Sequence, residues 1–447
     1  MDSLLVIAPH FPSPAESADG QSNYLTNIVP EVAKHVQVQI LSLRFGKQPP
    51  SESLNNCTIT RIEPPTKMGD VFALYLQPNL GPALASLHES ALRVAEKMST
   101  ATPVWCHGYE TGSVVEELAR RGHRVVAVPH YSVGVETIHD FALGDDETRQ
   151  HAFDSPWATK AGKLTPKHLR PLAVRWASRF GKYGKRLPLP SPIQTQFTKL
   201  DLERKMVANA SHLVAVGPSF EAELNALYPC TVSRSQHVIA GAPQQLPPAQ
   251  WPNTMVDEKL RIVMVGRPTG QKGWDYAVEA LGRLSEAQAS RIEIVLLGGL
   301  GTGNGPYSAY SSRVAAAFEQ LKPHHVHNLG AVSHPTVLAH LVAADVLLFP
   351  SVFEPLGLVL LEGMAAGCCV LSSNAAGPTD VVRPPWGLVV NFDDPESRSQ
   401  HLHAGIVSFL NLDRNELKER ASMAQRAAEK HTWKHCASIH LNALFGR

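Results

Sequence analysis

The chain has 447 residues, of which 44% are apolar and 18% charged, and its formal net charge is +1. That length favours two domains over one, and the apolar fraction is sufficient for two ordinary cores. The near-zero net charge excludes a general electrostatic attraction to nucleic acid.

The start of the chain and its cysteines indicate a compartment. Met1 is followed by an acid where a signal peptide carries bases, and the apolar run 4–8 is far shorter than the ~20 residues that span a bilayer. The six cysteines form no C-x-x-C pair, and the 21 histidines form no H-E-x-x-H motif. We therefore expect a cytoplasmic protein with reduced, mostly buried thiols and no metal.

Strands and helices alternate along the amino half. Continuous apolar runs predict strands, covered on both faces, at 4–8, 36–43 and 124–128, and a further strand ends at His107. Apolar residues at helical spacing predict helices at 24–32 and 114–121. Strand–helix alternation of this kind is typical of doubly wound parallel sheets.

The carboxyl half repeats this alternation. Strands are predicted at 260–265, 292–297, 326–329, 343–349 and 368–372. The proline-rich polar stretch 243–253 predicts the boundary between two domains. The end of the chain, 431–445, is predicted to form a helix.

One basic segment, 160–186, contains nine Lys or Arg and no acid. Within it Leu169, Leu172 and Trp176 share one helical face flanked by arginines, as in a basic amphipathic helix. Three interpretations stay open. A helix packed on the first domain is favoured over a surface that holds an acidic or zwitterionic acceptor, and membrane contact is the least favoured.

Two carboxylates, Glu354 and Glu362, stand eight positions apart in the carboxyl half. The strand 345–349 leads into the first, and a Pro-Leu-Gly turn then opens the apolar helix that carries the second. The pattern predicts Glu354 on a loop at the carboxyl end of a parallel strand, where ligands of open α/β sheets bind. It predicts Glu362 about two turns into the helix.

Two bases, Arg267 and Lys272, lie on a turn between a predicted strand and a helix that starts near Gly273. The amino end of that helix adds a partial positive charge at the turn. Arg267 can hold phosphate oxygens in a bidentate fork, and Lys272 adds a point charge. The turn therefore predicts a site for a diphosphate.

The Glu-x7-Glu spacing and the Gly-Arg…Lys-Gly turn together resemble the retaining nucleotide-sugar glycosyltransferases of family 4. The resemblance is firm over 260–395 and loose over 1–35, 100–135 and 200–240. It implies the GT-B fold, in which two doubly wound Rossmann-like α/β domains face each other across a cleft. The implied domains are an amino-terminal acceptor domain (1–245, with an insert at 140–200), a donor domain (246–430) and a last helix (431–447) that crosses back to the first domain.

The resemblance also implies roles for individual residues. The residues expected to take part in catalysis are His130, Arg267, Lys272 and Glu354. The residues expected to contact the donor are Gly20, Arg267, Lys272, Glu354, Leu356, Gly357, Leu358 and Glu362. Among these, Glu354 lies near the sugar and Glu362 accepts hydrogen bonds from the ribose hydroxyls. The acceptor is expected near His107, Tyr109 and Tyr131.

Three positions depart from the family pattern. Asp19-Gly20-Gln21 stands where the family has paired glycines, Val128 replaces a Thr, and Ala240 replaces an Asn. The donor is expected to be a UDP-, GDP- or ADP-sugar, with no metal and no other cofactor.

The resulting hypothesis is a retaining glycosyltransferase that moves a hexose-like sugar to a small-molecule acceptor in a specialised pathway, without a nucleic-acid partner. Two alternatives stay open: another GT-B activity, such as a phosphorylase or a nucleotide-sugar epimerase, and a non-catalytic nucleotide-sugar-binding partner protein. A dinucleotide oxidoreductase is disfavoured because no G-x-G-x-x-G follows the first strand of either half.

Overall fold

The structure is a computed structural model that describes residues 2–12, 20–69, 74, 81–140, 165–184, 191–252, 259–301, 308–321 and 325–446. These residues form two compact units. The amino-terminal unit contains 2–140, 165–240 and 433–446, and the carboxyl-terminal unit contains 241–432. Asp19, Asn253 and parts of the predicted insert 140–200 and of the basic segment 160–186 lie outside the described residues.

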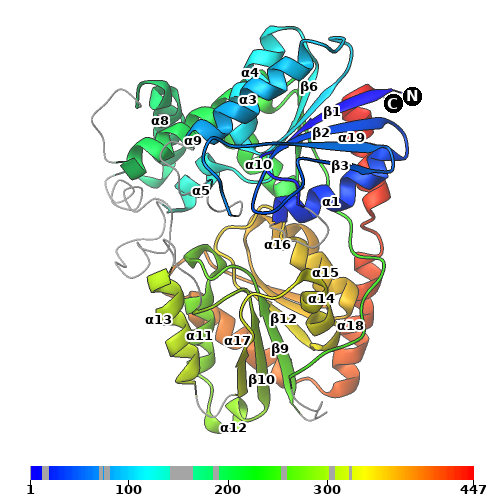
Figure 1. Ribbon diagram of the computed structural model, residues 1–447. Helices are drawn as coiled ribbons and strands as arrows, with labels where there is room; N and C mark the ends of the chain where they lie inside the picture. The colour runs from blue at the N-terminus through cyan, green and yellow to red at the C-terminus, as the bar shows by residue number, and fades with distance from the viewer. Residues whose placement is uncertain are drawn as a thin grey trace. The chain divides into compact units, whose positions relative to one another are not determined.

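The described part of the amino-terminal unit has an eight-stranded sheet in the order β3-β4-β2-β1-β5-β6-β7-β8 (Figure 1). Only β3 and β4 pair antiparallel among these strands. The strands are β1 (Ser3–Ile7), β2 (Gln37–Leu43), β3 (Ser51–Leu54), β4 (Cys57–Ile62), β5 (Val104–His107), β6 (Val125–Val128), β7 (His212–Ala215) and β8 (Ser235–His237). The predicted strands are confirmed within one residue at each end.

The β3–β4 hairpin was not predicted. Strand β3 is half-buried to exposed along its whole length, so it carries no apolar run or alternation that would mark a strand. It lies at the edge of the sheet, where a short polar strand is tolerated because only one side needs a partner.

Helices flank this sheet. They are α1 (Gly20–Ala33), α3 (Gly81–Ala95), α4 (Gly112–Arg120), α5 (Val133–Asp140), α8 (Arg170–Gly184), α9 (Ser191–Asn209), α10 (Pro218–Leu227) and α19 (Trp433–Phe445), with short 3-10 turns η2 (Tyr109–Thr111), η3 (Lys167–Leu169) and η4 (Pro229–Thr231). The last helix, α19, packs against α1 although the two are far apart in sequence (Figure 1).

Helix α8 belongs to the basic segment and packs against α9. Among the side chains of α8 that the structure describes, those of Val174 and Ser178 are buried. The apolar side chains that mark its amphipathic pattern point outward, because Leu172 is 56% and Trp176 63% exposed. The helix is therefore packed on the amino-terminal unit, but by a different face from the one that its sequence pattern suggests.

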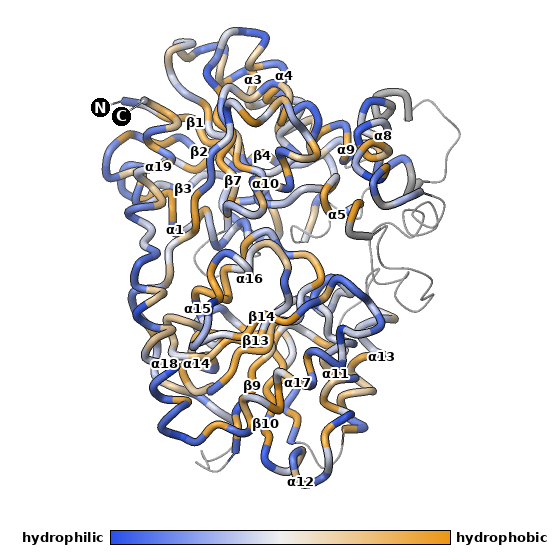
Figure 2. The backbone as a smooth tube through the Cα atoms, turned by 180° about the vertical axis from the view of Figure 1, so that it is seen from behind, coloured by the Kyte–Doolittle hydropathy of each residue, from blue (hydrophilic) through white to orange (hydrophobic). Residues whose placement is uncertain are grey.

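The described part of the carboxyl-terminal unit has a six-stranded parallel sheet in the order β11-β10-β9-β12-β13-β14. The strands are β9 (Leu260–Val265), β10 (Ile292–Leu297), β11 (His325–Asn328), β12 (Val346–Phe349), β13 (Cys369–Ser373) and β14 (Gly387–Val390). The backbone of β9, β10 and β13 runs through the interior as hydrophobic segments (Figure 2). The sequence indicated that the sheet ended at 368–372, which is wrong, because β14 adds an edge strand directly after a proline pair and Trp386.

The helices of this unit are α11 (Trp274–Gly282), α12 (Glu286–Ala289), α13 (Ser308–Glu319), α14 (His334–Ala343), α15 (Leu358–Ala366), α16 (Ala376–Val381), α17 (Arg398–Leu410) and α18 (Arg414–Ala428), with the 3-10 turn η5 (Gly270–Lys272). Local signals set their ends. Helix α18, for example, starts at a capping box in which Asp413 and Glu416 bond each other's backbone N–H.

In each sheet, the order in which successive strands are added reverses direction at one position. Strand β1 lies between β2 and β5, and β9 lies between β10 and β12. In open α/β sheets, loops on either side of such a switch point diverge and leave room for a ligand at the carboxyl ends of the strands. A ligand site is therefore expected at the loops that follow β1, β5, β9 and β12.

Two further observations concern disulfide bonds and membrane-spanning helices. The six cysteines form no disulfide, and five of them are buried, with Cys230 exposed. Among the described residues, none of the helices has both the length and the apolar character that crossing a bilayer would require.

Candidate functional site

The turns that follow β9 and β12 are in direct contact at the switch point. The backbone N–H of Val352 donates to the carbonyl of Gln271 at 2.7 Å. Gly273 has a φ of +64°, and a Cβ at this position would lie 2.0 Å from the carbonyl oxygen of Pro350. Only glycine fits such a left-handed position against a backbone carbonyl. The close approach therefore holds the two turns together.

This contact brings two of the predicted residues together. The ammonium of Lys272 forms an ion pair with the carboxylate of Glu354, and both side chains are largely buried. The Lys272 Nζ also lies 5.5 Å from the centre of the Phe349 ring, within the range of a cation–π contact. The predicted phosphate-binding base and the predicted sugar-binding acid thus lie in one site.

Arg267 is exposed on the turn that leads from β9 towards Lys272. Its carbonyl accepts hydrogen bonds from the indole Nε1 of Trp274 at 3.0 Å and from the N–H of Thr269 at 2.8 Å. Because Trp274 is fully buried in the core, these bonds fix the backbone from which the Arg267 side chain extends. The guanidinium can then reach an anion from a defined starting point.

The loop that carries Glu354 is held on its other side by α16. The N–H of Gly377 donates to the carbonyl of Glu354 at 2.8 Å, and a Cβ on Gly377 would lie 2.1 Å from the carbonyl of Leu356. Gly357 (φ +78°) is the N-cap residue of α15, and the helix itself starts at Leu358. The predicted donor-contact residues Glu354, Leu356 and Gly357 therefore lie on one loop in a fixed conformation, and Leu358 is the first residue of the helix that follows it.

Glu362 lies in α15 and is bound to a partner that the sequence did not indicate. Its Oε1 lies 2.8 Å from Nε2 of His334, the first residue of α14. The hydrogen bond that the His334 ring donates to the Glu362 carboxylate raises the pKa of His334 above its ordinary value, against the opposing effect of burial. No spacing rule links the two positions, because they lie on different helices.

In the amino-terminal unit, the structure brings His107 and His130 together at the carboxyl ends of β5 and β6. Nδ1 of His107 and Nε2 of His130 are 2.9 Å apart, and the two rings stack. Burial lowers the pKa of His130 to about 3, and burial together with the neighbouring histidines lowers the pKa of His107 well below its ordinary value. Both imidazoles are therefore neutral near pH 7.

Which of the two histidines donates this hydrogen bond follows from the surroundings of Nε2 of His107. Nε2 of His107 is buried and has no partner among the described residues. A buried N–H without a partner is rare, so we infer that His107 carries its proton on Nδ1 and donates it to His130. His130 then carries its own proton on Nδ1, and its half-buried ring can offer that N–H as a donor.

A second layer behind this pair involves α1 and α19. The Tyr24 hydroxyl lies 2.6 Å from Nε2 of His440, and the Tyr24 ring contacts the His130 ring edge-on. Burial lowers the pKa of His440 to about 3. Neither Tyr24 nor His440 carried a functional signal in the sequence, since each reads as part of an amphipathic helix.

Glu203 of α9 holds the segment that follows His130. Its carboxyl accepts hydrogen bonds from the N–H groups of Val133 and Gly134 at 2.5 and 3.2 Å, from Ser132 Oγ at 3.0 Å and from Tyr228 Oη at 2.6 Å. It is fully buried, and burial raises its pKa. Glu203 therefore caps α5 and fixes the backbone that leads away from His130.

The remaining predicted residues of this unit differ in their surroundings. Gly20 is exposed at the first position of α1, and the side chain of the next residue, Gln21, lies against Gly108 after β5. His107 and Tyr109 are buried, and Tyr131 is half-buried. Only Tyr131 of the three predicted acceptor residues has appreciable exposed surface.

No group of three or more His, Cys, Asp or Glu side chains in the part of the chain that the structure describes could hold a metal ion.

Part of the chain matches a known protein family. Residues 249–430 match the family described as "Glycosyl transferases group 1". This region contains all of the predicted residues from Arg267 to Glu362.

Two curated relatives show the extent of the similarity. The chain is 31% identical over 180 residues to a D-inositol 3-phosphate glycosyltransferase of Jonesia denitrificans, covering 40% of the chain and 41% of the relative. It is 29% identical over 253 residues to an alpha-maltose-1-phosphate synthase of Mycolicibacterium smegmatis, covering 53% and 63%. Other relatives are matched over 24–45% of their own length, so the sequence similarity is confined to part of each protein.

The fold is similar over a longer range. A sucrose-phosphate synthase from Thermosynechococcus elongatus superposes with a TM-score of 0.72 at 17% identity, covering 100% of this chain and 98% of the synthase. The similarity confirms the predicted fold class, an α/β chain with two Rossmann-like parallel sheets as in GT-B glycosyltransferases.

Proposed function

We propose that the protein is a retaining glycosyltransferase that transfers a hexose-like sugar from a nucleoside diphosphate to a small-molecule acceptor, within a specialised biosynthetic pathway. The observation that carries the proposal is the contact between Lys272 and Glu354. It joins a base and an acid from two neighbouring strand ends at the switch point, inside the region that matches the glycosyltransferase family.

The proposed reaction requires groups that stabilise negative charge on the leaving diphosphate. When the glycosyl bond breaks, negative charge develops on the leaving diphosphate, and groups already aimed at that position lower the barrier. Arg267 and Lys272 would bind the phosphate oxygens, with the amino end of α11 adding its partial charge. For this, Lys272 must exchange its bond to Glu354 for a bond to phosphate, which frees Glu354 to accept from the hydroxyls of the sugar.

Two more residues complete the proposed donor contacts. Glu362 would accept hydrogen bonds from the ribose hydroxyls, with His334 setting its orientation. His130 would donate from its neutral imidazole to a hydroxyl of the transferred sugar without adding a competing charge. The acceptor would be held mainly by the amino-terminal unit, beside His130.

The proposal is tested in two steps. A thermal-shift panel of UDP, GDP and ADP identifies the base, because a ligand that binds the folded chain stabilises it by mass action. The matching nucleoside diphosphate sugars are then incubated with candidate acceptors, and NMR of the product reports whether the anomeric configuration is retained. Sugar release only with inorganic phosphate, or isomerisation without an acceptor, would instead identify a phosphorylase or an epimerase.

A substitution tests the clamp directly. Arg267→Ala is expected to lower turnover by about 10²-fold or more, the usual effect of removing one donor to a transition-state charge. Arg283→Ala is the matched control, because it removes the same charge from an exposed position at the other end of α11. Equal turnover in the two variants would contradict the proposed role of Arg267.

A further inference from the structure

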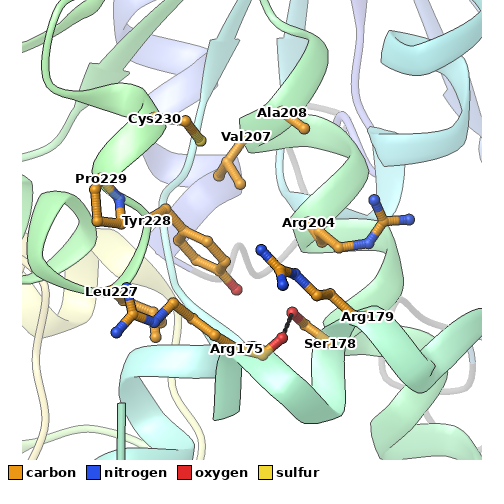
Figure 3. A pocket seen from close by; sticks show the side chains of 10 residues that line it. All are labelled: Arg175, Ser178, Arg179, Arg204, Val207, Ala208, Leu227, Tyr228, Pro229 and Cys230. Atoms are coloured by element: carbon orange, nitrogen blue, oxygen red, sulfur yellow. Dashed lines mark hydrogen bonds between the residues drawn. The ribbon is translucent and has the colours of Figure 1, made fainter. Parts of the chain in front are cut away.

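A cavity of about 430 Å³ lies wholly within the amino-terminal unit, between α8, α9, α10 and η4 (Figure 3). None of the site residues predicted from the sequence lines it. Its walls consist of Arg175, Ser178, Arg179, Arg204, Val207, Ala208, Leu227, Tyr228, Pro229 and Cys230. The volume lies in the range of small-molecule sites, ~300–1,000 Å³, and is larger than a single ion needs.

Two arginines give this cavity its charge. Arg175 and Arg179 stand one turn apart on α8, and none of the described residues that line the cavity is acidic. Like charges at this spacing repel each other on a helix. The Nε of Arg175 is buried and lacks a hydrogen-bond partner in the part of the chain that the structure describes. Both observations point to an anion that would pair with the two guanidinium groups.

The acids closest in sequence to the cavity walls already have partners. Asp201 binds Arg204 at 2.7 Å and Lys205 at 3.6 Å. The carboxyl of Glu203 accepts from Tyr228 and from the backbone of α5. In Figure 3 the Arg179 side chain extends towards the Tyr228 ring, whereas the Arg204 guanidinium points away from it. The positive charge offered to a ligand is therefore that of α8.

Part of the wall is apolar. It consists of the side chains of Val207, Leu227 and Pro229 and the ring of Tyr228. Two guanidinium groups match the double charge of a phosphate monoester, each can hold phosphate oxygens in a bidentate fork, and the apolar part of the wall suits a carbon body attached to the phosphate. We propose that this cavity binds the phosphate monoester group of a small, partly apolar molecule.

Two sources of such a group fit the same cavity. One is a soluble phosphorylated metabolite, and the other is the headgroup of an anionic phospholipid. The second is relevant because Leu172 and Trp176, on the same helix and within one turn of Arg175, are 56% and 63% exposed. Exposed Trp and Leu beside basic residues are typical of helices that lie at a membrane surface.

The test is a calorimetric titration with glycerol 3-phosphate and, separately, a flotation assay with phosphatidylcholine vesicles containing phosphatidic acid. All chains carry Arg267→Ala, so that the proposed diphosphate clamp contributes little to phosphate binding. The double variant Arg175→Gln/Arg179→Gln is compared with Arg170→Gln. Arg170 lies on the same helix but does not line the cavity. Melting temperatures without ligand confirm that each variant is folded.

We expect at least one probe to bind, with affinity lowered about tenfold or more in the double variant and unchanged in Arg170→Gln. Binding of glycerol 3-phosphate identifies a soluble ligand, and binding of the vesicles alone identifies a lipid headgroup. Binding of neither probe, equal binding by the double variant, or an equal loss in Arg170→Gln would overturn the proposal. The result does not depend on glycosyl transfer, so it can fail or succeed independently of the proposed function.

Discussion

Replacing Gly273 by alanine should separate the two turns that carry Lys272 and Glu354. At φ +64° an alanine costs about 1–2 kcal/mol relative to its preferred conformations. Its Cβ would also lie 2.0 Å from the carbonyl oxygen of Pro350, so the backbone of one turn must shift. Together these effects should lower the free energy of unfolding by about 2–4 kcal/mol.

A neighbouring glycine provides the control. Gly282 ends the same helix, and a Cβ there would meet only Leu321 Cδ2 at 3.6 Å, an ordinary contact. Gly282→Ala should therefore be neutral or stabilise the helix by up to about 1 kcal/mol. The measurement is calorimetric unfolding of the full chain, followed by titration with the nucleoside diphosphate that binds best.

The two variants should differ clearly. Gly273→Ala should melt at least about 4 °C below the wild type and bind the nucleotide more weakly, whereas Gly282→Ala should match the wild type in binding. If Gly273→Ala unfolds and binds as Gly282→Ala does, the close approach of the two turns does not position Lys272, and the argument for the site is wrong.

Three further predictions concern Glu362, its partner His334 and the buried histidines. Glu362→Gln should raise the donor KM more than it lowers kcat, because the ribose contact is made in the ground and transition states alike; an unchanged KM in steady-state assays contradicts the role. The ion pair of His334 with Glu362 is present below the raised pKa of His334 and is lost as the pH rises through it. Because His334 orients Glu362, nucleotide affinity should decrease over this pH range in the wild type relative to His334→Gln, and parallel titration curves would refute the coupling. His130 and His440 have pKa values of about 3, so an unfolded chain binds protons that the folded chain does not as the pH falls below 6.5. Stability should fall by about 2 kcal/mol per independent histidine between pH 6.5 and 5, and urea unfolding that is flat over this range would show that these rings are not buried neutral.

The sequence predicted what depends on local patterns. The apolar runs located most of the strands, and the position of Arg267, Lys272 and Glu354 after β9 and β12 placed them at one sheet edge. Parallel strands bring such loops together whatever their separation in the chain, so the contact of Lys272 with Glu354 could be expected from topology.

The rest depends on tertiary contacts that leave no pattern in one chain. His334 meets Glu362 from a different helix, and Glu203 reaches the backbone after His130 from α9. Both are single polar residues in helices, where sequence alone gives no reason to choose them over their neighbours. The amphipathic pattern of α8 also predicted the wrong buried face, because Leu172 and Trp176 face outward while Val174 is buried.

The most direct test of the proposed donor site is a crystal structure of the chain with the nucleoside diphosphate that stabilises it most. We expect diphosphate oxygens within hydrogen-bond distance of Arg267 and Lys272, a broken bond between Lys272 and Glu354, and ribose hydroxyls on Glu362. A nucleotide bound elsewhere, with Lys272 still paired to Glu354, would contradict it.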